Sequence, residues 1–410
     1  MRIGIPGYFA DVLPLLINLA LYLQDRGEEV FFIDPQPREV WVLKKHGLNR
    51  LFSKDICIQD EAFTPEAEQL LYEIMHDIVE RGPQRKTLKR NYLRKRALFV
   101  RENIEFLVVW NGALSMEHEI ARELSIDKIY LENGYFPDTL QVDRIGVNCQ
   151  TAFSAMSYEA FLAHTQMPPT DECPPAEIRH VKLNSAQCLL NFGLILREPM
   201  TLLQKLLFYQ KKIISQIKAS RLHEKNQTLP EPYIFIPFQV HDDSQLRCNS
   251  PIVKSMNDVL DMFYEDMRQV FPNHRIVIKE HPYDLGRHDY SELKRRYPDI
   301  LWLKKHNVNE LLEKAEVVIT VNSSVGLQAI AQHKKVLVLG DCFYRNNPFS
   351  EAIQTSDEFK NKLEALRDKS LDTSAVDQYI EHFKKNIFIS GGRKTFTPKT
   401  LAQIYAFIKA

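Results

Sequence analysis

The sequence lacks several features that would each indicate a particular class of protein. Its 53 basic and 53 acidic residues cancel, so no overall field attracts nucleic acid or an anionic membrane. Its 6 cysteines show no CxxC or metal-ligand spacing, which favours reduced thiols in a cytosolic protein. No hydrophobic run reaches the roughly 18 residues that a membrane span needs. Any anionic partner must therefore be bound by local groups.

The 410 residues, 44% of them hydrophobic, are enough for two domains. The N-terminal apolar stretch is interrupted by Asp11, Pro14 and Asn18, so it reads as strand, loop, helix and strand and not as a signal peptide. No GxGxxG pattern follows the first strand, which argues against a dinucleotide there. In this half we expect strands at 2–5, 29–33, 105–110 and 128–131, with helices at 13–26 and 116–124.

The second half repeats the alternation of strands and helices after a proline-flanked boundary at 230–232. We expect strands at 233–237, 275–279, 300–303, 317–320 and 335–339, and helices at 250–270, 290–297, 308–314 and 325–331. This pattern predicts an α/β protein with two Rossmann-like domains that face a cleft. The predicted domains are 1–228 and 229–385, with a C-terminal helical segment, 386–410, that packs back on the first.

The stretch YIFIPFQVHDDSQ, at 233–245, ends a hydrophobic strand in a cluster of polar groups. Ligands of open parallel sheets bind beyond the carboxyl ends of strands, so Gln239, Asp242 and Asp243 are candidate site residues. The alternative is a turn in which the two aspartates cap the next helix. Two adjacent carboxylates also leave a metal-ligand role open.

Two further strand ends in this half carry groups suited to chemistry. Lys279 and His281 follow the strand at 275–279, although His281 could instead be a core histidine. Ser323, Ser324 and Gly326 open a helix after the strand at 317–320, where hydroxyls and free amide groups could hold a phosphate. Plain helix capping is the alternative for the two serines.

The first half offers fewer candidates. Asn111 follows the strand at 105–110, and Glu132 follows the strand at 128–131, where it could meet a ligand or lie beside a turn. Asp34 at the end of the second strand is better explained by a turn. The predicted helix at 66–95 becomes strongly basic at 85–96, a pattern typical of a solvated face, with anionic lipid or acceptor binding as the alternative.

Several short motifs occur in fixed order between residues 105 and 345: WNG at 110–112, ENGYFP at 132–137, DRIGVN at 143–148, QVHDDSQ at 239–245, KEHP at 279–282, TVNSSVGLQAI at 320–330, and the later Gly340, Phe343 and Tyr344. In these motifs the sequence resembles the bacterial capsule polysaccharide biosynthesis proteins. That family includes KpsC and KpsS, and the resemblance is closer to the transferase domain of WbbB, which terminates O-antigen chains. Relatives of the KpsC type carry an acidic residue in place of His241 and EDG at 132–134, so the resemblance favours the WbbB-like branch.

The resemblance implies a modified GT-B fold and a retaining β-Kdo glycosyltransferase. Such an enzyme moves Kdo (3-deoxy-D-manno-oct-2-ulosonic acid) from CMP-β-Kdo to a saccharide acceptor in O-antigen or capsule synthesis. It implies Asp243 as nucleophile, with Asp242 as its rival, and Glu132 as general acid/base. The residues expected to bind the donor are Gln239, Lys279, His281, Ser323, Ser324 and Gly326. The residues expected to bind the acceptor or sugar are Asn111, Asn133, Tyr135 and Arg144.

Retention needs either two inversions or a front-face process, and two inversions require a covalent aspartyl-Kdo intermediate. CMP leaves with a phosphate charge that protein groups can stabilise, so we expect no metal or other cofactor. The expected partners are CMP-Kdo and a polysaccharide or glycolipid acceptor, and no nucleic acid. We expect a cytoplasmic protein, with peripheral association at the inner membrane of a Gram-negative bacterium left open. A nucleotide-sugar epimerase and a non-catalytic polysaccharide-assembly module remain as alternatives.

Overall fold

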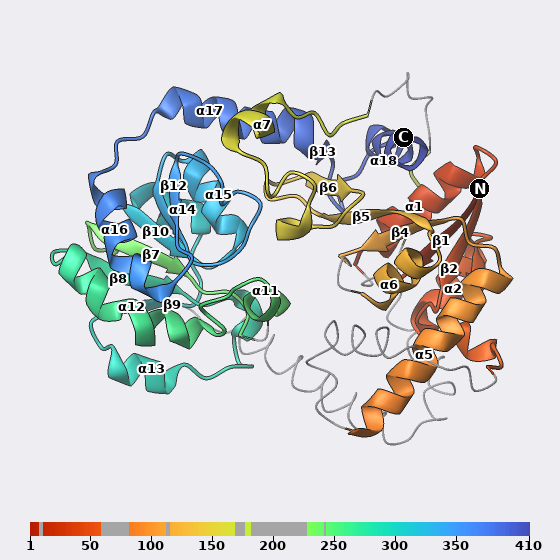
Figure 1. Ribbon diagram of the computed structural model, residues 1–410, viewed down its shortest axis with the longest axis horizontal. Helices are drawn as coiled ribbons and strands as arrows, with labels where there is room; N and C mark the ends of the chain where they lie inside the picture. Colours follow the sequence, from red (N-terminus) through yellow and green to blue (C-terminus); the bar gives the residue numbers. More distant parts are fainter. Residues whose placement is uncertain (8–10, 59–81, 112–114, 169–176, 182–227, 242) are drawn as a thin grey trace. The chain divides into compact units, whose positions relative to one another are not determined.

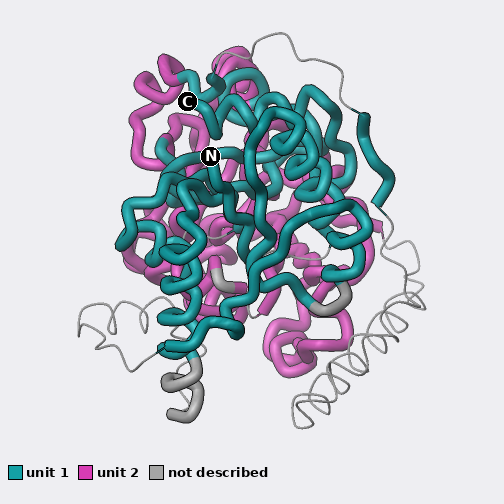
Figure 2. Tube along the Cα trace, turned by 90° about the vertical axis from the view of Figure 1, so that its right-hand side faces the viewer, with its two compact units in different colours: residues 1–152, 165–197, 384–410 teal, residues 153–164, 198–383 magenta. Residues whose placement is uncertain are grey.

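The computed structural model describes residues 1–7, 11–58, 82–111, 115–168, 177–181, 228–241 and 243–410. The chain divides into two compact units, shown in separate colours in Figure 2. Unit 1 comprises Met1–Ala152, Thr165–Arg197 and Lys384–Ala410, and unit 2 comprises Phe153–His164 and Glu198–Phe383. The structure thus places 153–164 with the second unit and the chain from 384 onwards with the first.

Unit 1 is built on a seven-stranded sheet in the order β13-β6-β5-β4-β1-β2-β3 (Figure 1). Five neighbouring strands run parallel: β1 (Arg2–Pro6), β2 (Glu29–Ile33), β3 (Asn49–Leu51), β4 (Phe106–Trp110) and β5 (Asp127–Asn133). Their order, 3-2-1-4-5, is the Rossmann order, with its switch point between β1 and β4.

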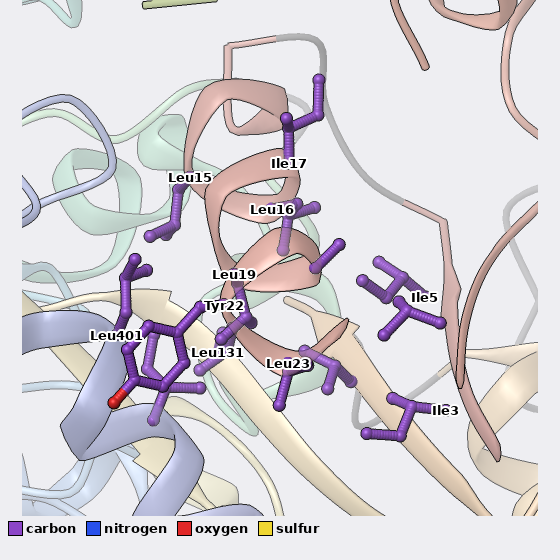
Figure 3. Close-up of a cluster of buried hydrophobic side chains, with 14 of the residues drawn as sticks. Ile3, Ile5, Leu15, Leu16, Ile17, Leu19, Tyr22, Leu23, Leu131 and Leu401 are labelled. Atoms are coloured by element: carbon purple, nitrogen blue, oxygen red, sulfur yellow. The ribbon is translucent and has the colours of Figure 1, made fainter. Parts of the chain in front are cut away.

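Helices cover both faces of this sheet. On one face α1 (Leu13–Gln24) packs its leucines on β1, because nearly all of its side chains are apolar (Figure 3). Leu401 of α18 (Pro398–Lys409) lies beside Tyr22 of α1 in the same cluster. On the other face the sheet contacts α5 (Gly82–Arg101) and α6 (Met116–Glu123). Burying each large aliphatic side chain stabilises this core by about 1.5–3 kcal/mol. The helix α2 (Pro37–Lys45) follows β2.

The sheet of unit 1 contains an antiparallel strand that the sequence analysis did not predict. The strand β6 (Thr139–Asp143) pairs with β5, so Glu132 lies opposite Gln141 inside a hairpin and not after the end of a strand. The strand β4 ends earlier, because Trp110 pairs with Leu131. Glu132 therefore still lies beyond the parallel part of the sheet. The Asn-Gly pair before the turn is a hairpin signal that the sequence contained.

The C-terminal segment completes unit 1. The short strand β13 (Ile389–Ser390) pairs antiparallel with β6, and α18 follows it. The guanidinium of Arg144 donates to the carbonyl of Phe407 at 2.7 Å, and Lys409 forms an ion pair with Glu28 at 2.7 Å. These contacts fasten the last helix to the sheet.

Unit 2 is built on a fully parallel six-stranded sheet in the order β12-β11-β10-β7-β8-β9. Its strands are β7 (Tyr233–Pro237), β8 (Arg275–Lys279), β9 (Leu301–Leu303), β10 (Val317–Thr320), β11 (Lys335–Val338) and β12 (Ser350–Ala352). Their side chains are buried almost throughout, as expected for a sheet covered on both faces. The order repeats the Rossmann pattern, with the switch point between β7 and β10.

Several helices of unit 2 begin at side-chain caps. Ser255 caps α12 (Met256–Val270) with a capping box, which explains why this helix starts later than the predicted residue 250. Asn307 caps α14 (Val308–Lys314), and Ser323 caps α15 (Ser324–Ala331). The other α-helices in the described part of the unit are α7 (Tyr158–Ala163), α11 (Ser244–Cys248), α13 (Ser291–Arg296), α16 (Phe359–Asp368) and α17 (Thr373–His382). The prediction of two Rossmann-like α/β domains is confirmed.

Some expectations fall on parts of the chain that the structure does not describe. Asp242, Gly112 and residues 66–81 of the predicted helix at 66–95 lie outside the described residues. Within the described ranges, no helix is long and apolar enough to cross a membrane.

Candidate functional site

The three polar strand ends predicted in the second half belong to neighbouring strands. The strands β10, β7 and β8 are adjacent in the sheet and parallel, so their carboxyl ends meet at one edge. The ladder between β7 and β8 continues one step further, since the Phe238 amide donates to the Lys279 carbonyl at 3.0 Å. This edge includes the switch point, where ligands of such sheets bind.

Gln239 and Asn322 form a buried brace across this switch point. The Gln239 amide nitrogen donates to Asn322 Oδ1 at 2.8 Å, and the Asn322 backbone N–H donates to Gln239 Oε1 at 3.2 Å. Asn322 Nδ2 also donates to the carbonyls of Gln245 and Asn249 in and after α11. The predicted donor residue Gln239 thus holds two strand ends together, and Asn322 is a structural residue that the sequence analysis missed.

Asp243 is the N-cap of α11. Its Oδ1 accepts the Gln245 backbone N–H at 2.9 Å, while its own N–H donates to the Val240 carbonyl at 3.0 Å. The capping alternative is therefore correct for this residue, and capping fixes the carboxylate at the edge of the sheet. Only one carboxylate oxygen, Oδ1, forms the cap, so a reaction at the other oxygen is compatible with capping.

His281 follows β8 and has a defined tautomer. Its Nδ1 accepts the Tyr283 backbone N–H at 3.2 Å, so the neutral ring carries its proton on Nε2. Burial lowers the pKa of His281, while the Asp284 and Asp243 charges raise this pKa and the Lys279 charge lowers it. These groups are therefore close enough to interact. His281 is suited to donate a hydrogen bond in its neutral form.

Asp284 is a buried carboxylate that the sequence analysis missed. It lies in the single turn after β8, and its side chain is 0% exposed. It accepts hydrogen bonds from the His241 backbone N–H at 3.0 Å, from His241 Nδ1 at 2.7 Å and from the Tyr290 hydroxyl at 2.9 Å. The His288 ring stacks on His241 at 4.6 Å between centroids. Only its place after the HP pair could have indicated Asp284.

The loop after β10 is fixed by packing. Ser323 caps α15, and its carbonyl accepts the hydroxyl of the fully buried Tyr344 at 2.5 Å. A Cβ at Gly326 would lie 2.3 Å from that hydroxyl, so this glycine is required by Tyr344. Ser324 is the first residue of the helix. Gly326 therefore has a packing role in the structure, and binding of a phosphate at the two serines stays a prediction.

In unit 1, Glu132 has the proton affinity of an acid/base residue. Burial raises the pKa of Glu132 to about 7, against the hydrogen bonds from Asn133 and the Arg393 charge, which lower this pKa. Both Asn133 bonds reach Oε1, from the backbone N–H at 2.7 Å and from the side-chain amide at 2.8 Å. A carboxylic acid with a pKa near 7 can both give and take a proton at neutral pH.

Arg393 is a charged neighbour of Glu132 that the sequence analysis missed. It forms an ion pair with Asp11 at 3.0 Å, and both charges act on the pKa of Glu132 in opposite directions. Its loop is held by hydrogen bonds from the Gly391 amide and the Thr395 hydroxyl to Asp138. No local motif marks Arg393, because its position depends on the return of the C-terminal segment to the sheet.

The predicted acceptor residues have different surroundings. Asn133 binds Glu132, and the Tyr135 hydroxyl donates to Asn148 Oδ1 at 2.9 Å. Arg144 binds the carbonyl of Phe407, which gives it a structural role in holding α18. Asn111 is exposed at the end of β4, with a positive φ of 46°. The structure thus groups Asn133 with Glu132 and directs Arg144 to the C-terminal helix.

Ion pairs balance part of the positive charge of the basic helix α5. Lys95 pairs with Glu117 at 2.5 Å, and Arg96 pairs with Glu123 at 2.6 Å. Asp34 accepts two hydrogen bonds from Ser53, which agrees with its predicted turn role. Membrane attachment through α5 stays a prediction.

Among the described residues, no group of three or more His, Cys, Asp or Glu could hold a metal ion.

Two Rossmann-like units place the chain in the class of α/β proteins that includes the GT-B glycosyltransferases. Residues 112–386 match the sequence profile of the family described as capsule polysaccharide biosynthesis protein. The chain belongs to this family, as its motifs suggested.

Individual relatives differ in how much of the chain they match. Protein FixF of Sinorhizobium fredii is 27% identical over 300 residues, which cover 72% of this chain and 63% of FixF. The capsule polysaccharide export protein KpsS of Escherichia coli is 30% identical over 148 residues, 33% of this chain and 37% of KpsS. The chain thus spans less than two thirds of these curated relatives. The solved structure of Thermosulfurimonas dismutans KpsC, a beta Kdo 2,7 transferase, is 14% identical with a TM-score of 0.43, covering 93% of this chain and 99% of that one.

Proposed function

We propose that the chain is a retaining β-Kdo glycosyltransferase that moves Kdo from CMP-β-Kdo to a saccharide acceptor in cell-surface polysaccharide synthesis. The observation that carries the proposal is the meeting of three polar strand ends at the switch point of unit 2. At that edge lie Asp243, whose carboxylate caps α11, and also His281, Lys279 and the start of α15. Membership of the capsule polysaccharide family supports the substrate class.

In the first step the Asp243 carboxylate attacks the anomeric carbon of Kdo. The new bond joins an Asp243 oxygen to that carbon, and the carbon–oxygen bond to the CMP phosphate breaks with its electron pair on the phosphate. His281 Nε2–H donates a hydrogen bond to the leaving phosphate, and the Lys279 ammonium balances its charge. The hydroxyls of Ser323 and Ser324 and the N-terminal end of α15 bind the same phosphate.

In the second step an acceptor hydroxyl displaces the Asp243 carboxylate from the opposite face. Glu132 takes the proton of that hydroxyl, for which its pKa of about 7 is suited. Two inversions give net retention. CMP leaves as a monophosphate that these protein groups can stabilise, so we propose that the reaction needs no metal and proceeds in the presence of a chelator.

The test is an incubation with CMP-Kdo and a panel of synthetic O-antigen and capsule termini, followed by product analysis. The proposal predicts a β-linked Kdo product, multiple-turnover CMP release that depends on the acceptor, and no effect of chelator. Conversion of the nucleotide sugar without an acceptor would instead indicate an epimerase. Acceptor binding without turnover would indicate an assembly module.

A further inference from the structure

The mechanism above does not use Asp284, the most deeply buried carboxylate among the described residues of unit 2. A buried carboxylate is costly unless its oxygens are hydrogen-bonded, and Asp284 receives bonds on both. Two of its three donors belong to one residue, His241, which lies on the loop between β7 and α11. The third, Tyr290, is also buried. The carboxylate therefore joins the loop after β8 to the loop that contains Asp243.

The hydrogen bond to Asp284 determines which ring nitrogen of His241 carries a proton. An ionised carboxylate can only accept, so His241 must carry a proton on Nδ1. The stacked His288 ring, with an interplanar angle of 21°, restrains the imidazole from one side. Asp243 is two residues further along the same loop and is tied back to it through the Val240 carbonyl. Fixing His241 therefore also limits the movement of Asp243.

We propose that Asp284 is a positioning residue of the donor site, which fixes His241 through its N–H and Nδ1–H groups and thereby places the loop of Asp243. Asp284 need not touch the substrate. The proposal rests on the proposed function in one respect, namely that Asp243 reacts with the donor.

Asp284→Asn is the informative variant, because it keeps the shape and changes the donors. The amide has one carbonyl oxygen and one donating nitrogen, so it cannot accept from both His241 groups and from Tyr290. An Asp→Asn exchange behind a histidine keeps the geometry but imposes the wrong tautomer. We expect the His241 proton to move to Nε2 and kcat to fall about 100-fold, as for a small misplacement of a reacting group.

The experiment measures the His241 tautomer by nitrogen-15 NMR, and kcat and KM for CMP-Kdo, in the full chain. Asp289→Asn is the matched control, because Asp289 is exposed on the same connection, and it should keep the tautomer and kcat. An Asp284→Asn protein with the wild-type tautomer, or with unchanged kcat, would overturn the proposal. If the wild type does not use CMP-Kdo, the proposed function fails, while the tautomer still decides the positioning.

Two variants of His241 test the proposal even if Asp284→Asn does not fold. The side-chain amide of His241→Asn can place a donor close to the position of Nδ1, whereas His241→Ala has none. The proposal predicts that kcat falls strongly in His241→Ala and recovers largely in His241→Asn, with KM little changed. If both variants are equally inactive, the imidazole itself acts on the substrate and the positioning role is wrong.

Discussion

The carboxyl edges of the two sheets hold their carboxylates in different ways. In unit 2, Asp284 accepts three hydrogen bonds from the groups around it, and Asp243 caps a helix. In unit 1, both bonds to Glu132 reach one oxygen and come from its neighbour in sequence, and burial raises the pKa of Glu132 to about 7. The carboxyl edge of a Rossmann-like sheet can thus hold a carboxylate that accepts several hydrogen bonds or one that exchanges protons, depending on the donors supplied.

The largest effect expected from this contrast is the loss of the proton-exchanging group. Glu132→Gln should lower kcat by about 10²- to 10⁴-fold, because a general base is removed. In the wild type, kcat/KM for the acceptor should rise with pH to a plateau above a midpoint near 7, and the variant should lack this rise. Asp127→Asn, an exposed exchange in the same strand, is the control. An unchanged pH profile in Glu132→Gln would show that another group takes the proton.

The raised pKa of Glu132 also predicts how stability depends on pH. The unfolded pKa of a glutamate is about 4.3, so between that pH and about 7 the folded protein binds more protons than the unfolded protein. The stability that this group contributes is therefore full below the unfolded pKa and is lost as pH rises through 7. Glu132→Gln should remove this part of the pH dependence, and urea unfolding at pH 5 and pH 8 measures it.

The hydrogen-bonded pair of Gln239 and Asn322 in unit 2 should contribute to the free energy of unfolding. Gln239→Ala and Asn322→Ala each leave a buried polar partner without a hydrogen bond, at a cost of about 1–3 kcal/mol in stability. Asn322→Ala should cost more, because two backbone carbonyls also lose their donor. The double variant should cost less than the sum of the two. Strict additivity in urea unfolding would show that the pair is not coupled.

His281 should affect donor binding and not the fold. His281→Ala removes a hydrogen bond to a charged phosphate, so CMP affinity and kcat/KM should fall about 10- to 100-fold. Isothermal titration with CMP and a thermal melt separate the two roles. A large drop in Tm with unchanged CMP affinity would favour a core histidine.

The smallest effects concern the charges around Glu132. Arg393 lowers the pKa of Glu132 and Asp11 raises it, so Arg393→Gln should move the midpoint of the pH profile up and Asp11→Asn should move it down. Each shift should be less than about 1 pH unit, because both charges are partly exposed. Lys394→Gln, an exposed exchange next to Arg393, should leave the midpoint in place. Shifts of the same sign in the first two variants would refute this assignment.

The sequence predicted much of this architecture because strands of a covered parallel sheet are short apolar runs. The strands at 233–237, 275–279 and 317–320 occur where they were predicted, and their adjacency follows from Rossmann order. The hairpin strand β6 was missed because its residues alternate weakly and its partner was read as ending at Leu131. Pairing across a hairpin depends on register, which the composition of one strand does not determine.

The candidate site was predicted less completely than the fold. Local motifs indicated Asp243, His281 and Glu132, because each follows or extends a buried strand. Asp284 and Arg393 act through partners 43 and 382 residues away in the chain, so no short pattern contains them. Gly326 was assigned to a phosphate, but the structure shows it packed against Tyr344, a contact that only the fold creates.

The most direct test of the account is a search for the covalent intermediate at Asp243. Incubation with CMP-Kdo alone, or of Glu132→Gln with donor and acceptor, should leave a Kdo-sized mass increment on the peptide that contains Asp243, because the second step is slow. Asp243→Asn should abolish both the increment and turnover, whereas Asp242→Asn should retain part of the increment. An increment that persists in Asp243→Asn, or robust turnover by that variant, would contradict the assignment of Asp243 as the nucleophile.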